Sequence, residues 1–248
     1  MKTVFINCSP KKRLAASSWF LALSRLFTGG EQVREKLRTP ADHERIMAAL
    51  ADADAAVLVL PLYVDGIPSH VLPFLEKLEQ FSREKGLHFR VFCIANNGFI
   101  EGRQNEPLMQ GFENFCARAG LQWCGGVGIG GGVMLNVTRI LFAVDIAILL
   151  LNMALSVANG GSLFPAGPLW SFAESALILL YFNLGVLFYL AQMGAAIRRG
   201  TVLGKKYTRI LIPSFIFILF ADVFFLIISV LKGGVFRGWL AKKQTDDL

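Results

Sequence analysis

The first 130 residues alternate between short apolar runs and longer segments in which apolar positions recur at helical spacing. Apolar β-rich runs predict strands, and apolar residues three to four positions apart predict helices. Apolar strands are expected at 3–7, 55–60, 88–95 and 121–129, and a short, exposed strand is expected at 32–38. Helices are expected between them at 14–27, 42–51, 69–85 and 107–119. The run 55–60 (AAVLVL) has no polar position, which is typical of a strand covered on both faces.

This order of elements predicts a doubly wound α/β fold with a five-stranded parallel sheet. Parallel strands joined by right-handed helical crossovers are the natural arrangement of alternating strands and helices with short connections. Ligands of such sheets bind beyond the carboxyl ends of the strands. The loops after the first, third and fourth strands are therefore the expected place of a functional site.

Residues 135–248 follow a different pattern. Three apolar segments, at about 137–157, 171–195 and 209–231, approach the ~20 residues that a bilayer core requires. The first is apolar on all faces, whereas a helix that covers a sheet keeps one polar stripe. We therefore expect two domains, an α/β domain at 1–134 and an all-α transmembrane bundle of about three helices at 135–248.

Composition supports this division. Of the 248 residues, 54% are hydrophobic and 17% are charged, against about 25% charged in an ordinary globular domain. The net charge of +7 is unevenly spread, because residues 1–134 hold 15 Lys/Arg against 13 Asp/Glu and residues 135–248 hold 10 against 5. The α/β domain is thus near neutral, which argues against nucleic acid as a partner. The lipid bilayer is the expected partner of the basic, apolar part.

The distribution of positive charge predicts the membrane topology. The segment 160–170 has no charged residue, whereas 198–209 has five cations and no acid. Positive segments stay in the cytoplasm. The N-terminus has no apolar run long enough for a signal peptide, so the α/β domain is also expected there. Two crossings must then precede 198–209, giving a cell-membrane protein with three spans. In the alternative topology with two spans, those five cations would lie on the outer side of the membrane.

Each expected span has one polar residue near its midpoint, namely Asp145, Asn183 and Asp222. Such groups are costly in a bilayer and normally face a bundle interior or a polar cavity. Two interpretations remain open: a relay for protons or a pocket for a quinone head, and a hydrogen-bonded knot that holds the helices together.

The four cysteines lie in the α/β domain, and no two have C-x-x-C spacing. This pattern argues against a metal site and favours reduced, buried thiols. They are Cys8, Cys93, Cys116 and Cys124. The sequence also has no convincing catalytic triad or paired carboxylates, so no catalytic side chain is assigned.

Three loops at the carboxyl edge carry candidate chemistry. Residues 9–13 (SPKKR) and the nearby Ser17 and Ser18 offer cations, hydroxyls and free helix N–H groups, which suit a phosphate, although a solvated basic turn has the same composition. This first loop has neither the G-x-G-x-x-G dinucleotide motif nor the G-x-x-x-x-G-K-[ST] P-loop motif. The loop 61–68 (PLYVDGIP) offers a flat apolar surface, and 96–102 (NNGFIEG) offers amides. Together they predict a site for a planar, phosphorylated ligand.

The motifs INCSP…SS, LPLYVDGIPSH, ANNGFIEG and GGVGIGGG occur in this order in the chain. Residues 2–132 thereby resemble the NAD(P)H-dependent FMN reductase branch of the flavodoxin-like superfamily. The resemblance implies a flavodoxin-like fold, an FMN whose phosphate lies on the first loop, and NAD(P)H as co-substrate. The FMN-binding residues that it implies are Ser9, Lys11, Ser17, Ser18, Pro61, Leu62, Tyr63, Val64, Gly66, Asn96, Asn97 and Gly98.

The resulting hypothesis is a membrane-anchored FMN-dependent oxidoreductase that takes electrons from NAD(P)H. The expected acceptor is a quinone or another membrane redox partner, because the chain is tethered to lipid. One alternative is a non-catalytic flavodoxin-like sensor or docking module. Another is a transporter subunit gated by the flavin, which three spans could form only as a homo-oligomer.

Overall fold

The computed structural model describes residues 1–12, 14–231 and 233–234, so Arg13 of the first loop lies outside the described residues. The chain divides into two compact units, residues 1–211 and 212–248. The first unit holds a sheet and helices α1 to α6, and the second holds α7. The expected domain boundary at residue 134 remains a prediction.

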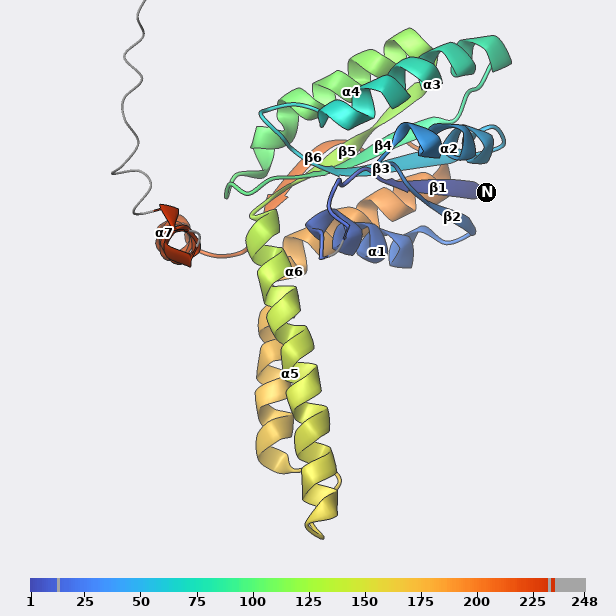
Figure 1. Cartoon of the computed structure of the whole chain (residues 1–248). Coiled ribbons are helices and arrows are strands. Elements are labelled where there is room, and N and C mark those ends of the chain that lie inside the picture. Colours follow the sequence, from blue (N-terminus) through green and yellow to red (C-terminus); the bar gives the residue numbers. More distant parts are fainter. Residues whose placement is uncertain (13, 232, 235–248) are drawn as a thin grey trace, which may run out of the picture. The chain divides into compact units, whose positions relative to one another are not determined.

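A parallel sheet forms the centre of the first unit (Figure 1). Its strand order is β2-β1-β3-β4-β5-β6. The order 2-1-3-4-5 is that of flavodoxin-like sheets, so the predicted doubly wound, flavodoxin-like α/β fold is confirmed. The strands are β1 (Lys2–Asn7), β2 (Glu31–Lys36), β3 (Ala55–Pro61), β4 (Arg90–Asn96), β5 (Gln122–Gly130) and β6 (Gly204–Arg209).

Helices cover both faces of this sheet (Figure 1). One face carries α2 (His43–Leu50), α3 (Leu72–Lys85) and α4 (Glu106–Ala119), with short 3₁₀ turns at Pro40–Asp42, Ser69–Val71 and Gly102–Asn105. The core beneath them includes the fully buried rings of Phe74 and Phe112. The other face carries α1 (Ala16–Thr28) and the second half of α6 (Ala166–Arg199).

The predicted count of five strands is wrong, because the segment expected to be a basic loop forms β6. It pairs in parallel with β5, from Gly125 opposite Gly204 to Gly130 opposite Arg209. The amine of Lys205 bonds the carboxylates of Glu106, at 3.0 Å, and Glu113, at 2.7 Å, on α4. The cations that suggested a cytoplasmic segment are thus partly paired with acids at the edge of the sheet, where lysines are common.

Three helices in the described part of the chain are long and apolar enough to cross a membrane: α5 (Gly132–Ala158), α6 and α7 (Ser214–Leu231). Helix α5 begins directly after β5, at the carboxyl edge of the sheet. It runs antiparallel to the first half of α6 (Figure 1), and the rings of Phe142 and Phe172 stack between them with centroids 5.3 Å apart.

The second half of α6 packs on the sheet instead of remaining in this hairpin. Val186, Leu190, Met193 and Ile197 are all buried. A Cβ at Gly194 would collide with the carbonyl of Phe27 in α1, so α1 and α6 touch backbone to backbone. This half of α6 therefore supplies the covering helix that the sheet needs on this face.

The third apolar helix starts later than the pattern suggested. It begins at Ser214, not near residue 209, because residues 204–209 belong to β6. Pro213 immediately precedes α7, which fits the frequent placement of proline around the first helical position.

Candidate functional site

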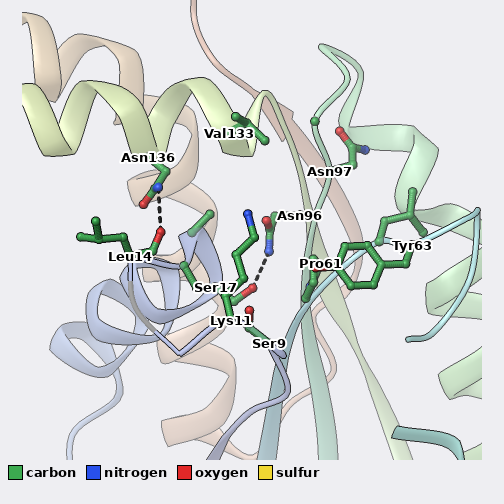
Figure 2. Close-up of a pocket in the computed structure, with 14 residues that line it drawn as sticks. Ser9, Lys11, Leu14, Ser17, Pro61, Tyr63, Asn96, Asn97, Val133 and Asn136 are labelled. Carbon is green, nitrogen blue, oxygen red and sulfur yellow. Dashed lines mark hydrogen bonds between the residues drawn. The ribbon is translucent and has the colours of Figure 1, made fainter. Parts of the chain in front are cut away.

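An open cavity of about 130 Å³ lies at the carboxyl edge of the sheet (Figure 2). This volume is smaller than the roughly 300–1,000 Å³ that is common for small-molecule sites, so a ligand bound here would extend into the open mouth of the cavity. The cavity lies where the start of α1, the loops after β3 and β4, and the first turn of α5 converge. Its lining residues are Ser9, Lys11, Leu14, Ala15, Ala16, Ser17, Pro61, Leu62, Tyr63, Asn96, Asn97, Gly98, Val133 and Asn136.

Nine of the twelve residues expected to bind FMN line this cavity, and three do not. The hydroxyl of Ser18 instead accepts a hydrogen bond from the amide of Asn7, at 2.8 Å. Val64 lies fully exposed at the tip of the loop after β3, with a φ of +47°. Gly66 closes the turn of that loop through its N–H, which donates to the carbonyl of Tyr63 at 3.0 Å.

One side of the cavity is built to hold an anion. Helix α1 has an extended N-cap, Ala15, and no side chain caps it in the described structure. The first N–H groups of a helix have no intrahelical i−4 acceptor. In α1 the N–H of Ser18 donates to the carbonyl of Ala15 at 3.1 Å, which leaves those of Ala16 and Ser17 at the positive end of the helix. Ser9 is buried beside them, and the side chain of Lys11 extends into the cavity (Figure 2).

The loop that carries Ser9 and Lys11 is held from two other elements. Arg38, just after β2, donates to the carbonyl of Lys11 at 2.8 Å. The Nε2 atom of His70 lies 3.1 Å from the carbonyl of Cys8, to which it can only donate. His70 therefore positions this loop. Sequence reasoning did not find the role of Arg38, since nothing in the pattern links it to residue 11.

The opposite side of the cavity presents amides. The Asn96 amide donates to the Ser17 hydroxyl and to the Leu60 carbonyl, each at 3.0 Å, and so ties α1, β3 and β4 together (Figure 2). The side-chain oxygens of Asn97 and Asn136 are buried and have no hydrogen-bond partner among the described residues. Buried acceptors are normally satisfied, so these two oxygens would gain a partner if a rotation of either side chain turned it toward the cavity.

The first turn of α5 contributes Val133 and Asn136, which sequence reasoning missed. The Asn136 amide donates to the carbonyl of Leu14 at 2.9 Å and so joins α5 to the loop after β1 (Figure 2). The apolar span was expected to begin at residue 137, which left these residues out. A usable signal existed, because a helix that follows the last strand of such a unit begins at the carboxyl edge of the sheet.

All four cysteines are buried and free, as predicted. Burial raises the pKa of Cys8 and Cys93 well above the usual range and raises that of Cys116 to about 12. Only the thiolate is reactive, so these thiols are inert near neutral pH.

We expect a maleimide to leave Cys8 and Cys93 unmodified in the native protein at pH 8, because both thiols are buried and protonated. Denatured protein is expected to react at all four cysteines. Mass spectrometry after each treatment checks this expectation. Rapid native labelling of Cys8 would show instead that the loop after β1 opens.

The three polar residues expected near the midpoints of the spans are placed differently from one another. Asp145 faces α6 and lines two adjoining cavities between α5 and α6. Asn183 is not mid-span, because it is buried where α6 meets the sheet, and its amide donates to the carbonyl of Leu179 at 2.8 Å. Asp222 lies in α7, in the second unit.

No protein-family model and no curated protein matches the sequence. A solved WrbA-like flavodoxin from Agrobacterium tumefaciens is 14% identical, with 80% of this chain and 98% of that chain covered and a TM-score of 0.46. A structure from P. pentosaceus described as an NADPH-quinone reductase is 16% identical, with 53% and 86% covered and a TM-score of 0.44. The Trp repressor binding protein from Bacillus subtilis is 17% identical, with 50% and 85% covered and a TM-score of 0.43. The fold assignment itself rests on the strand order of the sheet.

Proposed function

We propose that the carboxyl-edge cavity binds FMN and that the protein is a membrane-anchored, NAD(P)H-dependent flavin oxidoreductase. The observation that carries this proposal is the meeting of three features in one cavity. These are the uncapped start of α1, the apolar wall of the loop after β3, and two unpartnered amide oxygens. They match the phosphate, the flat ring and the ring N–H groups of a flavin mononucleotide.

Each side of the cavity has a defined task in this proposal. The N–H groups at the start of α1, with Ser9 and Lys11, hold the phosphate dianion. Pro61 and Tyr63 form the wall against which the ring lies, and the side-chain oxygen of Asn97 or Asn136 accepts from the ring N–H after a rotation toward the cavity. Bound FMN supplies the redox chemistry, and the protein supplies binding and orientation. No acid, base or nucleophile of the chain is required.

The membrane part of the proposal rests on the apolar helices and on β6. The segment 198–209 ends in a strand of the sheet, so its cations are on the same side of the membrane as the sheet. The hairpin of α5 and α6 must then cross and return, and α7 supplies a third crossing. Positive segments stay in the cytoplasm, so the sheet is placed there. A lipid-soluble quinone is the acceptor that this tethering favours.

Flavin titration of the purified full-length protein tests the proposal. We expect added FMN to bind with quenching of its fluorescence, and riboflavin, which lacks the phosphate, to bind at least about tenfold more weakly, a difference of about 1.4 kcal/mol. Equal affinities would contradict the assignment of the α1 end to the phosphate. A protein that binds neither would favour the alternative of a non-catalytic docking module.

A further inference from the structure

Helix α1 exposes apolar side chains on the face that points away from the sheet. Leu26 is 76% exposed, Ala22 is exposed, and Trp19 is half-buried. Their spacing of three and four residues places them in one stripe along the helix. The preceding Leu14 is 65% exposed and has a φ of +52°, an uncommon value for a leucine. A surface helix that faces water is normally polar along such a stripe.

The neighbouring helix continues the same apolar surface. In the half of α6 that packs on the sheet, Phe188 is 59% exposed and Leu184 is 45% exposed. Both lie on the side of α6 opposite to the buried Val186 and Leu190. The outer faces of α1 and α6 therefore form one apolar surface beneath the sheet, on the side toward which the α5–α6 hairpin runs (Figure 1).

Most charges next to α1 are cations, and exposed Glu31 just beyond its end is the exception. Helix α1 contains no acid, and Arg25 is its only charged residue. Lys11, Lys12 and Arg198 lie at the two ends of α1. The helices on the opposite face of the sheet differ, since the outer side of α3 carries exposed Glu76, Lys77, Gln80 and Glu84. An apolar stripe bordered by cations is typical of helices that lie on anionic membrane surfaces.

Two contacts with α5 fix the level of α1 along the hairpin. The Leu14 carbonyl accepts the hydrogen bond of Asn136, and the guanidinium of Arg139 lies over the ring of Trp19 at 5.6 Å. The predominantly apolar part of α5 begins at the next residue, Ile140. At a rise of 1.5 Å per residue, Ile140 is about 6 Å along the axis from Asn136. The headgroup layer on each side of a bilayer is itself about 5–8 Å thick.

We propose that the outer faces of α1 and of the second half of α6 rest on the cytoplasmic surface of an anionic bilayer. Leu14, Ala22 and Leu26 of α1 and Leu184 and Phe188 of α6 are the contacting residues. This inference rests on the membrane-spanning part of the proposed function. Its consequence is that the cavity, whose lining includes Leu14, opens at the headgroup level. A lipid-soluble acceptor then reaches the cavity without leaving the membrane.

Single cysteine labels test this contact. The variants are Ala22→Cys and Leu26→Cys on α1, with Gln80→Cys on α3 as the matched control. Each is labelled with an environment-sensitive fluorophore, which reacts at the introduced cysteine because the native cysteines are buried. The full-length proteins are placed in phosphatidylcholine/phosphatidylglycerol vesicles that contain doxyl-labelled lipid. We expect several-fold stronger quenching at positions 22 and 26 than at position 80. Equal quenching at all three positions overturns the inference.

Two further readouts separate this inference from the proposed function. A Ser162→Cys label, between α5 and α6, reports whether the hairpin crosses the bilayer, and the flavin titration reports the cofactor. If both behave as proposed while positions 22 and 26 are not quenched, only the surface contact fails. If Ser162→Cys is labelled from the side of the sheet, the spanning topology fails and the contact fails with it.

A charged variant provides the functional arm. We expect Leu26→Glu to slow electron transfer to a lipid-soluble quinone several-fold and to leave the rate with a water-soluble acceptor unchanged. Residue 26 does not line the cavity, so its effect on flavin binding should be small. If the variant and the native protein transfer electrons to the quinone at equal rates, the inference is overturned.

Discussion

Ala16→Glu is expected to abolish FMN binding while leaving the protein folded. Ala16 is the first residue of α1 and lines the cavity. A carboxylate at this position would face the phosphate at close range. Two like charges about 4 Å apart near a protein surface repel by about 4 kcal/mol, which lowers affinity by a hundredfold or more. Fluorescence titration with FMN measures the loss.

The fold should tolerate this change, because an acidic residue in the first turn stabilises a helix by about 0.3–1 kcal/mol. Thermal unfolding in detergent is therefore expected at the native temperature or slightly above it. Ala16→Gln is the matched control, since it adds the same bulk without charge and should retain most of the affinity. If the glutamate and glutamine variants bind FMN equally well, the phosphate does not lie at the start of α1.

Gly194→Ala is expected to destabilise the first unit, although alanine is the better helix former. A Cβ at Gly194 would collide with the backbone carbonyl of Phe27, which has no flexible end that can move away. Overpacking of this kind costs about 1–3 kcal/mol. In a domain of this size, this corresponds to a melting temperature lower by roughly 5 °C.

Gly167→Ala is the matched control in the same helix, because a Cβ there meets nothing within 4 Å. Relative to glycine, alanine favours the helix by up to about 1 kcal/mol, so this variant should melt at or above the native temperature. The melting temperatures of both variants are compared by thermal unfolding, with size-exclusion chromatography of each sample. Equal melting temperatures would mean that α6 does not pack closely on α1.

The sequence pattern was sufficient for the first five strands and for the helices between them. Their apolar runs are buried by local neighbours, so the period of each run reports its structure directly. The run 55–60 illustrates this, since it was expected to be covered on both faces and all six residues are buried in β3. The three loops expected at the carboxyl edge also line one cavity, because parallel topology brings the ends of the strands together.

The pattern failed where one segment has two environments. Helix α6 is predominantly apolar in both halves, and hydropathy does not distinguish burial against a sheet from burial in lipid. Its second half was therefore assigned to the membrane, and the strand that follows was taken for a loop. Tyr207 and Thr208 favour a strand, but the charged residues of β6 outweighed them in the pattern. The acids that pair with Lys205 lie about a hundred residues away in the sequence, on α4. Only the tertiary structure brings them together.

The same ambiguity affected the candidate site. Val133 and Asn136 belong to a helix whose long apolar part dominates the pattern, so its first turn was not considered as part of a cavity. Ser18 was expected to contact phosphate, and that stays a prediction. Its hydroxyl accepts from the amide of Asn7, whereas the neighbouring Ser17 lines the cavity, because adjacent residues at a helix start point in different directions.

The most direct test of the account is an anaerobic redox titration of the full-length protein in lipid nanodiscs. The account predicts a two-band flavin absorption spectrum that bleaches when NADH or NADPH is added and returns when a lipid-soluble quinone follows. A colourless protein that binds no added FMN would contradict the central claim.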